Sequence, residues 1–157
     1  IDTNATFIEE SRSLGLNVEP GDLVDFLRAA PEGSFGAITM FQVLEHLPFA
    51  AVVEVIQSAA RVLRPGGVFI AEVPNAKNLR VGAGTFWIDP THERPWYPDV
   101  LEFLTRSFGF SGVTGHYLHP VLDSPDLDGV PDNVAVLLRR VLEAIDGPVD
   151  YAVVARL

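Results

Sequence analysis

The sequence contains no cysteine. This absence excludes disulfide bonds, thiolate catalysis and zinc sites built from cysteine. It also suits a reducing compartment, and we expect the protein to be cytoplasmic. A run of about 18 apolar residues is missing too, so no membrane span is expected. The first residues, Ile1-Asp2-Thr3-Asn4, lack the basic segment of a secretory signal peptide.

Basic residues are scarce, because 11 Lys and Arg stand against 21 Asp and Glu, which gives a net charge of −10. Nonspecific binding to nucleic acid depends on basic patches that neutralise phosphates, so no long nucleic acid is expected as a partner. The chain has 157 residues and 48% of them are hydrophobic. These values predict a single globular domain over residues 1–157.

Strand-like and helix-like segments alternate along the chain. Helices are predicted over about residues 5–14, 23–30, 49–63, 98–108 and 131–145, and strands over 16–19, 35–41, 68–73, 110–118 and 149–157. Residues 74–96 and 119–132 are expected to be loops. This order predicts an α/β doubly wound sheet. In such sheets ligands bind beyond the carboxyl ends of the strands, so polar residues at those ends are the candidates for a site.

Two aspartates occupy such positions. Asp2 follows what reads as the end of a strand, where a carboxylate is able to accept both hydroxyl protons of a ribose. Asp22 follows the segment 16–19 and is placed to accept a hydrogen bond from an adenine amino group. For each aspartate the alternative is that it caps the helix that begins just after it, and the sequence leaves both alternatives open.

Four segments in a fixed order carry a family resemblance: Ile1 to Asn4, Gly21 to Leu23, Phe41 to Leu47 and Leu63 to Gly67. In order and spacing they resemble class I S-adenosylmethionine-dependent methyltransferases. The resemblance implies a Rossmann-like, mostly parallel sheet with an antiparallel last strand, and S-adenosyl-L-methionine as the methyl donor. It further implies that Asp2 binds the donor's ribose, that Asp22 and the Leu23 amide contact adenine, and that Phe41 and Gln42 line the methionine part.

One part of the family pattern is absent. The Gly-rich motif that follows the family's first strand would lie upstream of Asp2, and the sequence Val81-Gly82-Ala83-Gly84 is expected to be a hinge rather than a substitute. We therefore expect the chain to represent the C-terminal part of a methyltransferase domain whose N-terminal strands are missing. The edge of the strand at 35–41 would then be covered by the rest of the parent protein or by a homodimer partner.

A looser resemblance starts at Asp89-Pro90-Thr91-His92 and continues through Arg94-Pro95 to Gly109-Phe110. It is similar to bacterial methyltransferases of sugar and surface-polysaccharide pathways. His92 is the candidate base, because O-methylation requires a hydroxyl to lose its proton; a purely structural role for His92 stays open. Trp87, Trp96 and Tyr97 are candidates for a wall that stacks against a small-molecule acceptor, or for packing over the sheet.

A divalent cation such as Mg²⁺ is a further candidate. Glu45 and His46 follow the strand at 35–41, and together with His92 they offer a carboxylate and two imidazoles as ligands. The arrangement resembles the Glu-x-x-Glu-His and distant His sites of ubiquinone-biosynthesis O-methyltransferases and small-RNA 2′-O-methyltransferases, with Gln42 in place of the first Glu. The alternative is that Glu45 and His46 are a pair at the start of a helix that only orders the loop.

Other polar residues are not expected to form a site. The spacing of an EF-hand is missing among Asp123, Asp126, Asp128 and Asp132, which predicts a solvated acidic loop. His116 and His119 are predicted at the surface.

The expected function is S-adenosylmethionine-dependent methyl transfer to a small molecule, at a hydroxyl of a sugar or another metabolite. Because the Gly-rich motif is absent, the alternative is a catalytically degenerate methyltransferase fold that acts as a scaffold or dimerisation module. A nicotinamide-dependent oxidoreductase is a weaker alternative, since it also needs a glycine fingerprint that this sequence lacks.

Overall fold

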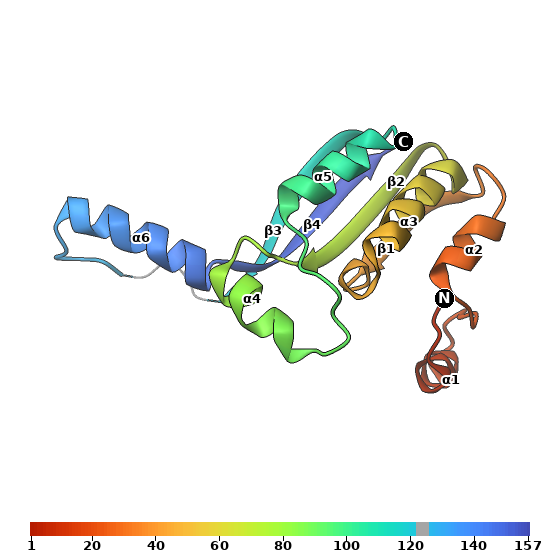
Figure 1. Ribbon diagram of the computed structural model, residues 1–157, viewed down its shortest axis with the longest axis horizontal. Helices are drawn as coiled ribbons and strands as arrows, with labels where there is room; N and C mark the ends of the chain where they lie inside the picture. Colours follow the sequence, from red (N-terminus) through yellow and green to blue (C-terminus); the bar gives the residue numbers. More distant parts are fainter. Residues whose placement is uncertain (122–125) are drawn as a thin grey trace.

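The computed structural model describes residues 1–121 and 126–157, in which helices and strands alternate (Figure 1). The helices are α1 (Ala5–Ser13), α2 (Leu23–Ala29), α3 (Phe49–Val62), α4 (Leu79–Ala83), α5 (Pro98–Ser107) and α6 (Asp132–Asp146). Two 3-10 turns, η1 (Leu44–His46) and η2 (Thr85–Ile88), and four strands complete the fold: β1 (Phe35–Phe41), β2 (Leu63–Pro74), β3 (Ser111–Pro120) and β4 (Pro148–Arg156). The predicted α/β class is confirmed.

The four strands form one sheet in the order β1-β2-β4-β3. β1 and β2 are parallel, whereas β4 runs antiparallel to both β2 and β3. The predicted antiparallel last strand is therefore confirmed. Since β2 and β3 both oppose β4, the strands β1, β2 and β3 point the same way, and their carboxyl ends share one edge of the sheet.

The hydrophobic core lies between the sheet and the helices α3 and α5, which Figure 1 shows side by side over one face. Alternate residues of β2 point into this core and are fully buried: Phe69, Ala71 and Val73. α3 presents an apolar stripe to it at spacings of three and four residues: Val52, Val55, Ile56 and Ala59. Because side chains alternate along a strand, Glu72 of β2 and its neighbours at even positions lie on the opposite face.

β1 is an edge strand in the part of the chain that the structure describes, since its partner there is β2 alone. An uncovered edge at this strand was expected from the sequence. α2 lies beside α3 on this side of the molecule (Figure 1). Arg28 of α2 pairs with Glu54 of α3 at 2.6 Å, and Arg61 of α3 donates to the carbonyl oxygens of Leu27 (2.7 Å) and Ala30 (2.9 Å).

Two predictions about strands were wrong. Residues 16–19 form no strand. Directly after them, Pro20 makes a single parallel bridge to Asp2, and one bridge does not make a strand ladder. The strand predicted over 68–73 is longer than expected, because β2 already begins at Leu63. The register with β1 shifts between the pairs Phe35–Leu63 and Ala37–Val68, so residues 63–67 are an irregular start of β2. Gly66 has a positive φ of 77° in this segment, which glycine adopts without strain.

The segment 74–96 was predicted to be a loop but holds α4 and η2. The side chain of Asn78 caps α4 by accepting hydrogen bonds from the amides of Arg80 (2.9 Å) and Val81 (3.2 Å). The expected hinge at Gly82 is also wrong, because this residue lies within α4 and an added Cβ would stand 2.8 Å from the Ala76 carbonyl oxygen. Among the described helices, none combines the length and the apolar character needed to cross a membrane.

Candidate functional site

The segments that carry Asp2 and Asp22 lie side by side at the start of the chain. The Asp2 amide donates to the Glu19 carbonyl oxygen (3.2 Å), and the Gly21 amide donates to the Asp2 carbonyl oxygen (3.0 Å). These two bonds flank the bridge between Asp2 and Pro20. The structure thus brings together two segments that the sequence separates, as a shared donor-binding surface requires.

Each aspartate also makes local hydrogen bonds. Asp22 Oδ1 accepts from the amides of Val24 (2.8 Å) and Asp25 (3.0 Å), so Asp22 is the N-cap of α2. Asp2 Oδ1 accepts from the Asn4 amide (2.7 Å), and Asn4 rather than Asp2 caps α1. The capping alternative is therefore confirmed for Asp22, and the donor roles of Asp2, Asp22 and the Leu23 amide stay predictions.

The carboxyl end of β1 supplies the other two predicted donor contacts. Phe41 is 56% exposed at the last position of the strand. Gln42 follows with a positive φ of 54°, and its side-chain amide donates to Asp150 Oδ1 (3.1 Å) and Glu72 Oε1 (3.3 Å). Gln42 is thus held against β2 and β4, and its contact with the donor stays a prediction.

Glu45, His46 and His92 come together in one cluster, although His92 comes from a different loop. One ligand atom of each lies within 4.8 Å of the other two. Glu45 is fully buried, and neither of its carboxylate oxygens has a hydrogen-bond partner within the described structure. Burial raises the pKa of Glu45. A buried carboxylate without partners is costly unless a proton or a cation neutralises it, so this cluster is the strongest candidate for a functional centre.

The two imidazoles are fixed through their Nδ1 atoms. His92 Nδ1 lies 2.7 Å from the Phe86 carbonyl oxygen, and His46 Nδ1 lies 3.3 Å from the Thr91 carbonyl oxygen. A carbonyl oxygen only accepts hydrogen bonds, so the proton of each neutral ring is on Nδ1. Nε2 of each ring is then the atom that is able to accept a proton or bind a metal.

Asp89 and Thr91 form a chain of hydrogen bonds that ends on His46. The Thr91 hydroxyl donates to Asp89 Oδ1 (2.7 Å) and lies 2.9 Å from His46 Nδ1. The hydrogen bonds from Thr91 lower the pKa of Asp89, which keeps this carboxylate ionised. Sequence reasoning singled out the run from Asp89 to His92 but assigned no role to Asp89 or Thr91, because no local pattern shows that Thr91 meets His46.

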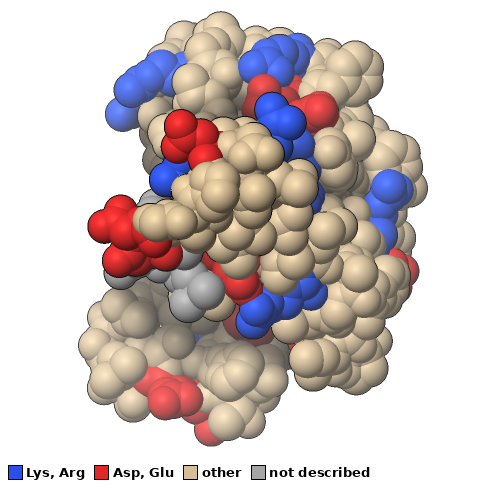
Figure 2. Space-filling view, turned by 90° about the vertical axis from the view of Figure 1, so that its left-hand side faces the viewer, with Lys and Arg blue, Asp and Glu red and all other residues tan. Residues whose placement is uncertain are grey.

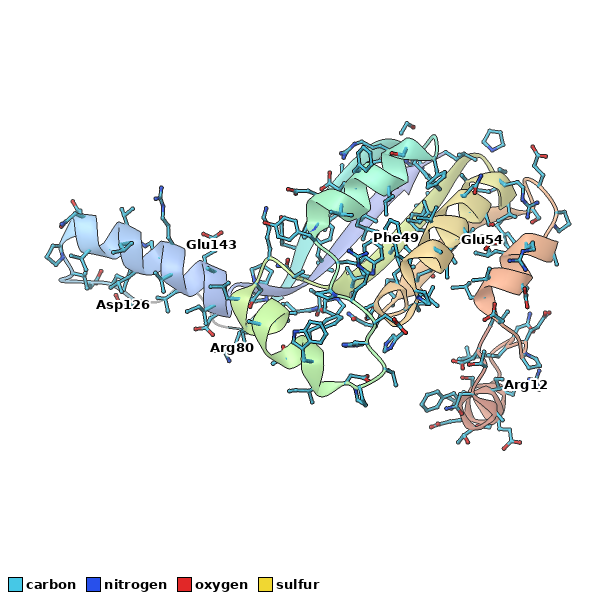
Figure 3. All side chains as sticks on the ribbon, in the orientation of Figure 1. Arg12, Phe49, Glu54, Arg80, Asp126 and Glu143 are labelled. Atoms are coloured by element: carbon cyan, nitrogen blue, oxygen red, sulfur yellow. The ribbon has the colours of Figure 1, made fainter. Side chains whose placement is uncertain are left out.

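The loop after β2 folds back onto η1 and holds it in place. The Trp96 indole donates to the Leu44 carbonyl oxygen (3.0 Å), and the Glu93 amide donates to the Glu45 carbonyl oxygen (2.8 Å). Trp96 is only 1% exposed and packs against Phe49, which Figure 3 labels at the start of α3. The prediction that Trp96 belongs to an acceptor wall is therefore wrong, and the alternative that Trp96 packs over the sheet is confirmed.

The remaining candidates lie at the surface. Trp87 and Tyr97 are 57% and 44% exposed, so their predicted contact with an acceptor stays open to test. His116 and His119 are exposed, as predicted, although His119 Nδ1 lies 2.8 Å from Asp150 Oδ2. Of the acidic loop, Asp126 accepts from the Asp128 amide (2.9 Å), whereas Asp123 lies outside the described residues.

The sequence and fold match known methyltransferases. Residues 1–71 match the family model of a methyltransferase domain. A relative from Mycolicibacterium smegmatis, described as a probable S-adenosylmethionine-dependent methyltransferase, is 33% identical over 95 residues, which are 60% of this chain and 35% of the relative. The chain thus matches about a third of the length of this curated relative.

Solved structures extend the likeness to nearly the whole chain. A SAM-dependent methyltransferase from Archaeoglobus fulgidus superposes with a TM-score of 0.87 at 23% identity, over 99% of this chain and 73% of that one. An S-adenosylmethionine-dependent methyltransferase from Mesorhizobium loti gives a TM-score of 0.66 at 14% identity, over 99% of this chain and 77% of that one. The resemblance to sugar-pathway and ubiquinone-type enzymes stays a prediction. In sequence, residues 1–71 match the methyltransferase domain family, and in fold the chain is similar to solved S-adenosylmethionine-dependent methyltransferases.

Proposed function

We propose that the chain transfers the methyl group of S-adenosyl-L-methionine to a hydroxyl oxygen of a small molecule, such as a sugar or another metabolite. The acceptor oxygen forms a bond to the methyl carbon as the carbon–sulfur bond breaks, and the sulfur keeps the bonding electron pair. The hydroxyl proton leaves to a base at the same time. Alignment of the two substrates supplies most of the rate in such a displacement.

The observation that carries this proposal is the unpartnered carboxylate of Glu45 beside two imidazoles. The cluster lies beyond the end of β1, where ligands of this fold bind. Asp2, Asp22 and Leu23 would hold the ribose and adenine of the donor, while Phe41 and Gln42 would border its methionine part. His92 would then receive the acceptor proton on Nε2, because its Nδ1 already carries a proton.

A divalent cation is the alternative occupant of the cluster. One carboxylate and two imidazoles fit a metal, and this set favours a transition metal such as Mn²⁺ or Zn²⁺ over Mg²⁺, which prefers oxygen ligands. When bound, the cation would lower the pKa of the acceptor hydroxyl. His92 cannot be both a metal ligand and the proton acceptor, since both roles use Nε2.

Calorimetric titration with S-adenosyl-L-methionine tests the donor half of the proposal. Saturable binding to the chain supports it, followed by gain of one methyl group in a panel of hydroxylated metabolites, detected by mass spectrometry. Absence of binding, including to a form of the protein that carries a Gly-rich motif ahead of Asp2, would instead favour the degenerate fold that acts as a scaffold or dimerisation module. The edge strand β1 is the feature that favours this second function, because its outer backbone groups offer a pairing site for a second copy or another part of the parent protein.

Removal of metal separates the two roles of His92. If a cation is bound, dialysis against a chelator abolishes methyl transfer and a defined divalent ion restores it. If His92 is the base, methyl transfer is insensitive to the chelator and falls at least about tenfold in His92→Ala, with donor binding unchanged. Full activity in His92→Ala would remove both roles.

A further inference from the structure

A hollow lies where α6 meets the sheet. It has a volume of about 460 Å³ and shares no lining residue with the Glu45–His46–His92 cluster. Its walls come from the loop after β2, from β3 and from α6, and the lining residues that matter below are Asn75, Lys77, Asn78, Tyr117, Arg140 and Glu143. In Figure 3, Glu143 of α6 and Arg80 of α4 mark this junction.

The floor of the hollow is rigidly built. Asn75 and Asn78 are each 3% exposed. The Asn75 side chain donates to the Pro148 carbonyl oxygen (2.8 Å), and the Asn78 side chain donates to the Gly147 carbonyl oxygen (3.1 Å). Arg80 also pairs with Asp146 at the end of α6. These bonds fix α6 against the loop after β2, so the hollow exists before a ligand arrives.

Two cations face the hollow. Lys77 Nζ lies 3.3 Å from the Tyr117 hydroxyl and 5.8 Å from the ring centroids of both Tyr97 and Tyr117. Arg140 lies on the α6 side. Within residues 1–121 and 126–157, neither cation forms an ion pair with a carboxylate. Glu143 is the acidic residue among those that line the hollow, so the lining carries a net positive charge in a chain of net charge −10.

The hollow and the proposed catalytic cluster are connected through one loop. Asn75 pairs with Trp96, and the Trp96 indole donates to the Leu44 carbonyl oxygen beside Glu45. Both sites lie near the edge of the sheet where β1 and β2 end. An acceptor that extends along this edge, with its hydroxyl at the cluster and a second group at the hollow, is the arrangement that the proposal below requires. Figure 2, which faces the α6 end of the molecule, shows acidic and basic side chains interspersed there rather than one acidic surface.

We propose that this hollow binds an anionic group of the methyl acceptor, a carboxylate or a phosphate, through Lys77 and Arg140. The rings of Tyr97 and Tyr117 would contact the carbon framework next to that group. The inference rests on the proposed function, because it makes the anion a part of the methyl acceptor.

Titration of the full chain with phenyl phosphate, followed by the amide resonances of Asn75 and Asn78 in ¹H–¹⁵N spectra, tests the site. Phenyl phosphate is expected to shift these resonances and to bind at least about tenfold more tightly than phenol, which has the ring without the charge. Benzoate is the second arm and distinguishes a carboxylate from a phosphate as the preferred anion.

Arg140→Ala should weaken the binding of phenyl phosphate about tenfold. Arg139→Ala is the matched control, because Arg139 is exposed on the same helix but does not line the hollow. Equal weakening by both variants would reduce the effect to general surface charge and overturn the proposal, as would equal affinity for phenol. The titration needs no methyl donor, so its failure is separate from failure of the donor titration that tests methyl transfer.

Discussion

The rings of His46 and His92 lie 4.6 Å apart, centroid to centroid, beside the buried carboxylate of Glu45. His46 belongs to η1 after β1, and His92 belongs to the loop after β2. The phenyl ring of Phe86 also packs against His92, at 4.4 Å from centroid to centroid. This contact joins two segments that are far apart in the sequence, and its chemistry leads to the first two predictions.

Glu45→Gln removes the charge of the cluster and keeps its shape. We expect methyl transfer to fall at least about tenfold, while binding of S-adenosyl-L-methionine is unchanged. The melting temperature should stay the same or rise, because an unpartnered buried carboxylate costs more than a buried amide. Glu54→Gln is the matched control, since Glu54 makes an exposed ion pair with Arg28. A fully active Glu45→Gln variant would contradict a role for this carboxylate.

Thr91→Val removes the hydroxyl that links Asp89 to His46 and keeps the size of the side chain. His46 Nδ1 then loses the nearer of its two hydrogen-bond partners and keeps only the Thr91 carbonyl oxygen, so we expect activity or metal affinity to fall about 10-fold to 100-fold. Thr91→Ser should restore most of the loss, because serine also offers a hydroxyl. Thr91 is a positioning residue in this account, and equal activity of the Val and Ser variants would argue against it.

Much of the fold follows from local patterns in the sequence. β1 was predicted with its observed bounds, because an apolar run of strand length stands between a loop and a polar segment. α3 was predicted within one residue at its end, because Val52, Val55, Ile56 and Ala59 recur at helical spacing. The components of the cluster were also predicted, since Glu45 and His46 follow β1 directly.

What sequence reasoning missed depends on long-range contacts. Trp96 looks like an exposed aromatic in a polar loop, and only the fold shows that its indole reaches the Leu44 carbonyl oxygen. α4 has five residues, too few to show a periodicity, and its cap by Asn78 is a weak signal alone. The hollow beside α6 unites Lys77, Tyr117 and Arg140, which no motif connects.

Tyr151→Phe tests a partly buried hydrogen bond between β4 and α5. The Tyr151 hydroxyl donates to Glu102 Oε1 (2.6 Å) and lowers the pKa of Glu102 below its ordinary value of 4.5. A lowered carboxyl pKa contributes stability that is fully present above pH 4.5 and is lost as the pH falls through the lowered value.

We therefore expect Tyr151→Phe to lower the free energy of unfolding by about 1–2 kcal/mol at neutral pH. The difference from the unaltered protein should shrink in acid, when Glu102 is protonated. Urea unfolding at both pH values measures this. Tyr117→Phe is the control, because Tyr117 is 47% exposed and should change stability little. A loss for Tyr151→Phe that does not depend on pH would place its cause in packing instead.

Asp22 both caps α2 and is proposed to contact adenine, and two substitutions separate these roles. Serine is as good an N-cap as aspartate, so Asp22→Ser should keep the stability of the protein, whereas Asp22→Ala should lose about 1 kcal/mol. The single hydroxyl of serine is taken up by the amides of Val24 and Asp25, which leaves no carboxylate oxygen for the donor. Both variants should therefore bind S-adenosyl-L-methionine about tenfold more weakly in calorimetric titrations. Unchanged affinity in Asp22→Ser would assign Asp22 to the cap alone.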